Sequence, residues 1–146
     1  MLVEIKIDKE LKEPKLIVCT NKITNELNNF INKIEDYNFQ KIIGIQDNEM
    51  FILEPRDIES FYSENNKVYA QKGNEKYRIK MKFYEIEELL KESTFIRISN
   101  SEIANFDLVD SLEVVGSLEI KLKFKSGNST YVSRRNISKI KKYLGI

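Results

Sequence analysis

Polar side chains suited to binding phosphates and base edges are concentrated in the segment 94–106. Its apolar residues have the pattern of a β-strand that ends near Ile98. Among and just after them stand an arginine and three small hydrogen-bonding residues: Arg97, Ser99, Asn100 and Ser101. Proteins use these side-chain types to contact phosphate oxygens and base edges. The segment therefore predicts either an interface for another molecule or, more simply, a polar strand edge followed by a helix cap.

A second candidate is the pair Arg134 and Arg135, at the start of a predicted C-terminal helix. Cations are disfavoured at the N-terminal end of a helix, so a purely structural role explains the pair poorly. Two arginines beside free backbone N–H groups suit a phosphate or a base edge. Lys139, later in the same helix, extends the positive charge, although a lysine there is equally typical of a solvated helix face.

The distribution of charge agrees with the second of these candidates. The formal net charge is only +1, which by itself suggests no partner. From Ile120 to the C-terminus, however, the chain carries lysines and arginines and no acidic residue. Segregation of this kind creates a local positive face on a nearly neutral molecule.

Composition argues against most kinds of catalysis. The sequence has no histidine, which removes the usual general base and the commonest metal ligand. A single cysteine, Cys19, rules out a thiolate zinc site and an internal disulfide, and is typical of a reducing cytoplasm. The five glycines are scattered, so there is no phosphate-binding loop. We expect no enzymatic activity, no metal, no cofactor and no small-molecule substrate.

The pattern of apolar residues predicts a mainly β protein with minor α structure. Residues 2–7 and 15–20 have the pattern of strands, and residues 21–36 that of a helix with one apolar face. From residue 41 onward short strands follow one another, with turns predicted at Glu64–Asn66 and Lys72–Asn74. Short helices are predicted near residues 84–93 and 133–144. This organisation divides the chain into a β-β-α segment, 1–40, and a strand-rich domain, 41–146.

Two sequence blocks, "FIRISNSEIANFDLVDSLE" and "LKFKSGNSTYVSRRNISKIKKYL", resemble the LytTR-type DNA-binding domain of bacterial transcription regulators. The resemblance extends from about Lys41 to Leu144. It rests on a strand ending in Phe-x-Arg-x-x-Asn-Ser, on the step Ala104–Asn105, and on a Val-Ser-Arg-Arg helix start. It implies about ten short strands in small sheets, and contact with successive major grooves of double-stranded DNA through loops.

The resemblance also implies roles for particular residues. Asn100 and Arg135 match base-contacting positions, and Lys67 falls at a third contacting position, where some relatives have histidine. Side chains expected to contact DNA around these three are Arg97, Ser99, Ser101, Arg134 and Lys139. Asn105 is expected to serve the fold instead, by satisfying backbone groups of its own turn.

Family members often carry a receiver domain, but only about 40 residues precede the strand-rich region here, so a stand-alone regulator is expected. Binding as a homodimer on repeated half-sites is expected, with the segment 1–40 as a dimerisation or regulatory element. An alternative for this segment is that it merely packs on the domain. The resemblance also suggests a small membrane protein as a regulatory partner.

Two other functions compete with DNA binding. The protein could be an interaction module that captures a membrane or regulatory partner without binding DNA. It could also be an RNA-binding β module, whose stacking aromatic residues would be Tyr62, Tyr69 and Tyr77, although these tyrosines are better explained as packing the hairpins.

Overall fold

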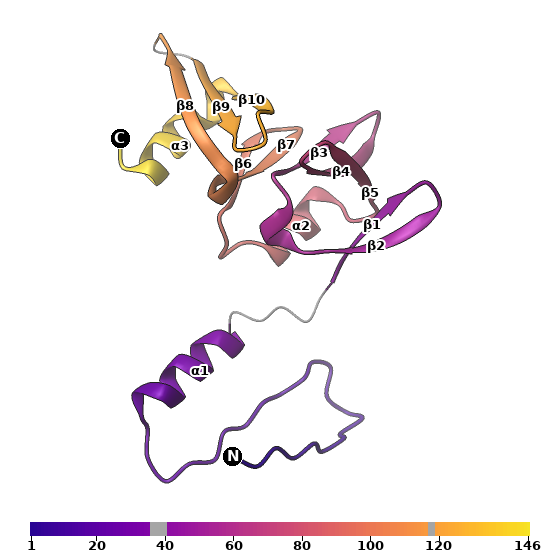
Figure 1. Ribbon diagram of the computed structural model, residues 1–146, viewed down its shortest axis with the longest axis vertical. Helices are drawn as coiled ribbons and strands as arrows, with labels where there is room; N and C mark the ends of the chain where they lie inside the picture. The colour runs from indigo at the N-terminus through magenta and orange to yellow at the C-terminus, as the bar shows by residue number, and fades with distance from the viewer. Residues whose placement is uncertain (36–40, 117–118) are drawn as a thin grey trace. The chain divides into compact units, whose positions relative to one another are not determined.

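The computed structural model of the protein describes residues 1–35, 41–116 and 119–146. The chain divides into two compact units, Met1–Asn38 and Phe39–Ile146, and each is described by itself (Figure 1). The boundary predicted after residue 40 borders the segment 36–40, which lies outside the described residues. No helix in the described ranges is long and apolar enough to cross a membrane.

In the described part of the first unit, residues 1–35, there is one helix, α1 (Asn25–Glu35), which lies within the range predicted for a helix. The Thr24 hydroxyl accepts a hydrogen bond from the backbone N–H of Leu27 at 3.1 Å and so caps the helix start. The two strands predicted for residues 2–7 and 15–20 are wrong, because no described residue before Ile42 belongs to a strand. Alternating apolar residues specify a strand face, but a strand also needs a hydrogen-bonded neighbour, and these segments do not pair with each other.

The second unit confirms the mainly β prediction. Its strands are β1 (Ile42–Gln46), β2 (Glu49–Leu53), β3 (Ser60–Glu64), β4 (Lys67–Lys72), β5 (Glu75–Ile79), β6 (Phe95–Ser99), β7 (Glu102–Asn105), β8 (Val109–Val115), β9 (Glu119–Phe124) and β10 (Ser129–Val132). Its helices are α2 (Phe83–Leu89) and α3 (Ile137–Leu144), with short 3₁₀ turns η1 (Pro55–Asp57), η2 (Phe106–Leu108) and η3 (Arg134–Asn136).

The strands form two antiparallel sheets. One has seven strands in the order β2-β1-β5-β4-β3-β7-β6, and the other has three in the order β10-β9-β8. Tight turns join the hairpins: Glu64 pairs with Lys67 across a turn of Asn65 and Asn66, both with positive φ. Asparagine tolerates this left-handed conformation better than most residues, which explains why the sequence identified the turn. The turn predicted at residues 72–74 is confirmed between β4 and β5.

Two apolar cores share the β6–β7 hairpin as a common wall. The first lies between the seven-stranded sheet and α2, and includes Phe61, Ile86 and Ile103. The second is built from β6, β7, the three-stranded sheet and α3, and includes Ile98, Ala104 and other residues. Neighbouring residues of β7 enter different cores because successive side chains of a strand point to opposite faces. The β6–β7 hairpin therefore lies between the three-stranded sheet and the rest of the larger sheet (Figure 1).

Candidate nucleic-acid interface

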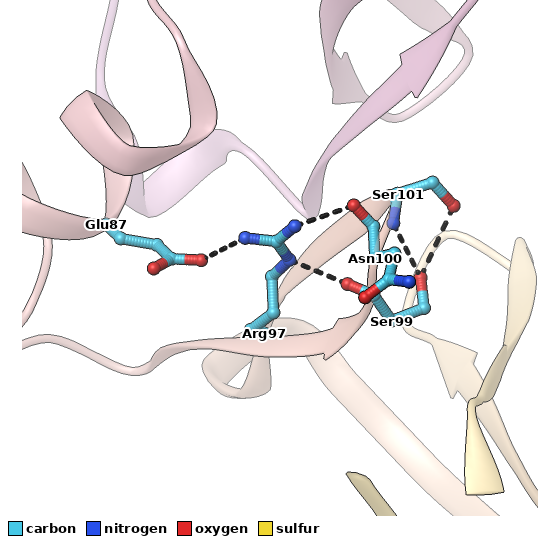
Figure 2. Close-up of polar contacts among 5 residues, drawn as sticks. All are labelled: Glu87, Arg97, Ser99, Asn100 and Ser101. Atoms are coloured by element: carbon cyan, nitrogen blue, oxygen red, sulfur yellow. Dashed lines mark hydrogen bonds and ion pairs between the residues drawn. The ribbon is translucent and has the colours of Figure 1, made fainter. Parts of the chain in front are cut away.

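The turn between β6 and β7 presents Asn100 to solvent. The Ser99 hydroxyl accepts a hydrogen bond from the backbone N–H of Ser101 at 3.2 Å, and the two serine hydroxyls lie 3.4 Å apart (Figure 2). The Asn100 side chain is exposed and makes no hydrogen bond to any other residue that the structure describes. The turn thus holds its backbone with local hydrogen bonds and leaves the asparagine amide available for a ligand.

Arg97 lies beneath this turn and is engaged on three sides by the protein. Its Nε donates to the carbonyl oxygen of Ser99 and its Nη2 to that of Asn100, both at 2.6 Å. Its Nη1 forms an ion pair with Glu87 of α2 (Figure 2). The guanidinium carbon lies 4.8 Å from the ring centroid of Phe83, at cation–π distance. Every nitrogen of the guanidinium therefore has a protein partner.

The second candidate segment is η3, which carries Arg134 and Arg135 directly before α3. The amide of Asn136 donates to the Ser133 hydroxyl at 2.7 Å, closing the turn on itself. Both arginine side chains are exposed, and neither has a hydrogen bond or ion pair within the described part of the chain. Ile137 and Ile140, one turn later, are buried and anchor α3 to the second core. The buried apolar face of α3 thus holds η3 in place, while the side chains of Arg134 and Arg135 remain available for a ligand.

Two hydrogen bonds connect the segments that carry Asn100 and Arg135. The backbone N–H of Ser133 donates to the carbonyl oxygen of Ile98 at 2.9 Å. The Thr130 hydroxyl donates to Oε2 of Glu102 at 2.6 Å, linking the strand after the first turn to the strand before the second. Both exposed side chains therefore project from one packed structure rather than from separately mobile loops.

Glu102 itself is largely withdrawn from water. Burial raises the pKa of its carboxyl, and hydrogen bonds from Thr130 and Ser60 oppose that rise. A neighbouring carboxylate, Glu59, is only 4% exposed. It accepts hydrogen bonds from Ser126 at 2.7 Å and from the Asn128 amide at 2.9 Å, which tie the β9–β10 turn to the larger sheet.

The remaining sequence-predicted residues lie nearby in the same unit. Lys67 is exposed at the start of β4. The preceding strand of this hairpin, β3, contacts the Asn100 turn, because the backbone N–H of Ser63 donates to the carbonyl oxygen of Ser101 at 2.8 Å. Lys139 of α3 is exposed and lines a cavity of about 270 Å³ together with Glu87 and Arg97. The side-chain ammonium group of neither lysine has a hydrogen bond or ion pair with another described residue.

The prediction that Asn105 serves the fold is confirmed. Its side chain is 1% exposed, and its amide donates to the carbonyl oxygen of Ile58 at 3.0 Å. Its Oδ1 accepts from the Thr94 hydroxyl at 2.6 Å and from the backbone N–H of Asp107 at 3.1 Å. One side chain thus connects three segments of the chain.

The three tyrosines considered for base stacking pack within the protein. Tyr77 is 8% exposed and belongs to the first core. The rings of Tyr62 and Tyr69 stack on each other across β3 and β4, with centroids 5.6 Å apart. This arrangement is what the packing explanation predicts.

Sequence reasoning missed the residues that support the site, chiefly Glu87, Glu59 and Glu102. By sequence alone, Glu87 is only an acid near the start of the helix predicted at residues 84–93, where acids are common. Its contact with Arg97 spans ten positions and the Glu59–Asn128 contact spans 69, so no local spacing could have indicated either.

Comparisons with known proteins give this geometry a family. The family model described as the LytTr DNA-binding domain matches residues 48–145. This family is defined by a DNA-binding domain and is not a class of enzymes. A protein of Staphylococcus aureus strain MSSA476, named an uncharacterized HTH-type transcriptional regulator, is 30% identical over 100% of this chain and 99% of its own length. A similarly named protein of strain NCTC 8325 is 32% identical over 86% of this chain and 85% of its own.

The fold has a match among solved structures as well. The LytTr DNA-binding domain of a Bacillus cereus protein superposes with a TM-score of 0.69 and 19% identity, over 73% of this chain and 99% of that one. This likeness concerns the fold. Although the relatives are named as HTH-type, each α-helix in the described ranges is separated from the next by strands. Because the family model matches residues 48–145, the chain belongs to the LytTr DNA-binding domain family.

Proposed function

We propose that the protein is a sequence-specific, DNA-binding transcription regulator that contacts successive major grooves through loops. The observation that carries the proposal concerns the side chains of Asn100 and Arg135. Both are exposed and have no hydrogen-bond or ion-pair partner among the described residues, and they project from segments joined by the Ser133–Ile98 hydrogen bond. Asparagine and arginine are side chains that form paired hydrogen bonds with adenine and guanine edges. Membership in a DNA-binding family supports double-stranded DNA as the ligand.

The roles within the interface follow from chemistry and exposure. Asn100 and Arg135 contact base edges, and Lys67 is a third contact from the β3–β4 hairpin. The side chains proposed to contact phosphates, and so to contribute affinity without sequence preference, are Ser99, Ser101, Arg134 and Lys139. Arg97 has all its nitrogens on protein partners, so we assign it a positioning role in place of a phosphate contact.

Selection of bound DNA from a random pool tests the proposal. The wild type is expected to enrich a defined sequence, and fluorescence anisotropy should then show tighter binding to that target than to a scrambled duplex. Asn100→Ala should remove most of this preference. Asn74→Ala, at an exposed turn between β4 and β5, is the matched control and should leave it intact. Failure to enrich any DNA would favour the alternative of a protein-interaction module.

We further propose that a homodimer binds repeated half-sites, with the unit Met1–Asn38 as the element that pairs. Its helix α1 has one apolar face, and none of its residues is buried; Phe30, for example, is 40% exposed. Multi-angle light scattering should detect a wild-type dimer that Phe30→Glu weakens, while Asn29→Glu on the same helix should not. A monomeric wild type would reject the dimer and leave a regulatory partner, such as a small membrane protein, as the ligand of this face. A regulator acting on DNA in this way would work in the cytoplasm.

A further inference from the structure

The contact between Glu87 and Arg97 joins helix α2 to the turn that carries Asn100. We propose that Glu87 is a positioning residue for base recognition: through Arg97 it sets the conformation of the Asn100 turn. This inference rests on the proposed function, because it assumes that Asn100 contacts a base. Helix α2 would then contribute to sequence preference without contacting a base itself.

The guanidinium of Arg97 is held in one orientation. Its plane is fixed by three separate partners, namely Glu87, the Ser99 carbonyl and the Asn100 carbonyl. Its carbon lies against Phe83, also from α2. The side chain of Arg97 is 30% exposed and that of Glu87 is 43% exposed, so the ion pair is partly shielded from water. A planar group held by several partners keeps its orientation better than a lysine ammonium would.

The orientation of this guanidinium decides where the Asn100 side chain points. Two successive carbonyl groups, those of Ser99 and Asn100, accept hydrogen bonds from the same guanidinium, which fixes the peptide planes on either side of the Asn100 Cα. A β-bulge between Arg97 and Ser99 makes this part of β6 irregular, so the strand ladder alone does not set the turn. Paired hydrogen bonds to a base require placement within about 0.5 Å. Loss of the Glu87 anchor would let the guanidinium, and with it both carbonyls, shift.

The same helix provides a matched control. Glu88, the next residue, forms an ion pair with Lys91 at 2.9 Å, and its side chain is 74% exposed. That pair joins two residues on the protein surface. No hydrogen bond or ion pair within the described part of the chain links it to Arg97 or to the Asn100 turn. Glu87→Gln and Glu88→Gln thus remove the same charge from adjacent positions, and only the first is expected to alter base recognition.

The test compares these variants in full-length protein, on the selected target and on a scrambled duplex. Glu87→Gln should weaken binding to the target about tenfold, and its effect on the scrambled duplex should be within about twofold. Glu88→Gln should change neither. In an Asn100→Ala background the effect of Glu87→Gln should disappear, because the group it positions is gone. Equal weakening on both duplexes, or an undiminished effect in the Asn100→Ala background, would overturn the proposal.

A measurement without DNA tests the coupling itself. In ¹H–¹⁵N spectra, Glu87→Gln should shift the Arg97 Nε–H and the backbone amides of Asn100 and Ser101, while Glu88→Gln should leave them in place. Melting temperatures check that both variants stay folded. Unchanged resonances in Glu87→Gln would refute the link from α2 to the turn. A wild type that selects no DNA would instead refute the proposed function and, with it, the role in recognition, even where the resonances move.

Discussion

The backbone N–H of Ser133 donates to the carbonyl oxygen of Ile98 at 2.9 Å. Ser133 lies two residues before Arg135, and Ile98 lies two residues before Asn100, the two residues proposed to contact bases. Ile98 is fully buried, so the bond lies against the second core rather than at a mobile surface. The bond thereby holds the two backbone segments that carry these side chains together before any ligand binds. A preorganised pair of contacts loses less conformational entropy on binding than two flexible loops would.

The first prediction concerns sequence discrimination by Arg135. Because a paired arginine–guanine contact is worth roughly 1–3 kcal/mol of discrimination, Arg135→Ala should weaken binding to the selected target by about that amount. Binding to a scrambled duplex should fall much less. Fluorescence anisotropy titrations at one fixed salt concentration measure both. Lys142→Ala, an exposed cation of α3, should instead lower affinity slightly for every sequence. An equal loss on both duplexes for Arg135→Ala would reject its role in base contact.

The second prediction concerns phosphate contact by Lys139. Each phosphate contact releases condensed counterions, so the affinity of a variant lacking one depends less steeply on salt. Lys139→Ala should reduce the slope of log affinity against log salt by about 1, on target and scrambled DNA alike. Titrations across a range of salt concentrations give the slope. An unchanged slope would place Lys139 outside the interface. Lys9→Ala, in the first unit, is the control, and its slope relative to the wild type gives the experimental error.

The sequence predicted the local features of the second unit well. Strand alternation and turn residues are properties of a few neighbouring positions, which explains why the hairpins around Asn65–Asn66 and Gly73 were identified. The role of Asn105 was also accessible, because asparagine at a turn satisfies nearby backbone groups. The side-chain types of Asn100 and Arg135 indicated a binding surface, and the fold brings their segments together.

What the sequence did not indicate depends on tertiary contact. Arg97 has the side-chain type of a phosphate ligand, yet its nitrogens are satisfied by Glu87 and two carbonyls, which only the folded chain brings within reach. Residues 2–7 have a strand pattern but no strand partner. In both cases the residue pattern indicated which interactions a segment can form. The packing of the other segments determined which interactions it does form.

The third prediction is a stability effect at Asn105. Its amide and carbonyl groups satisfy Thr94, Asp107 and the Ile58 carbonyl in a buried site, so Asn105→Ala leaves several polar groups without partners. The free energy of unfolding should fall by roughly 2–4 kcal/mol. Urea denaturation followed by circular dichroism measures this loss. The same substitution at exposed Asn100 should change stability by less than about 0.5 kcal/mol, and a comparable loss there would contradict the distinction between a structural and a ligand-binding asparagine.

The fourth prediction is a pH dependence of stability that comes from Glu102. Burial raises the pKa of its carboxyl above the ordinary value of 4.5, so the folded state holds a proton more tightly than the unfolded state does. The stabilising contribution is therefore fully present below pH 4.5 and is lost as pH rises through the higher folded-state pKa. Glu102→Gln, which stays neutral, should lack this loss. Its free energy of unfolding, relative to the wild type, should increase from pH 4 to pH 7.5.

Urea denaturation at several pH values between these limits measures the difference between Glu102→Gln and the wild type. The glutamine can still accept the hydrogen bond that Thr130 donates to Glu102, so a change that is the same at every pH reports altered packing and not proton binding. Glu113→Gln, at an exposed position of β8, controls for the loss of one negative charge and should give a smaller change with pH. A difference that falls as pH rises would mean that the hydrogen bonds from Thr130 and Ser60 outweigh desolvation, so that the carboxylate is the favoured form in the folded protein.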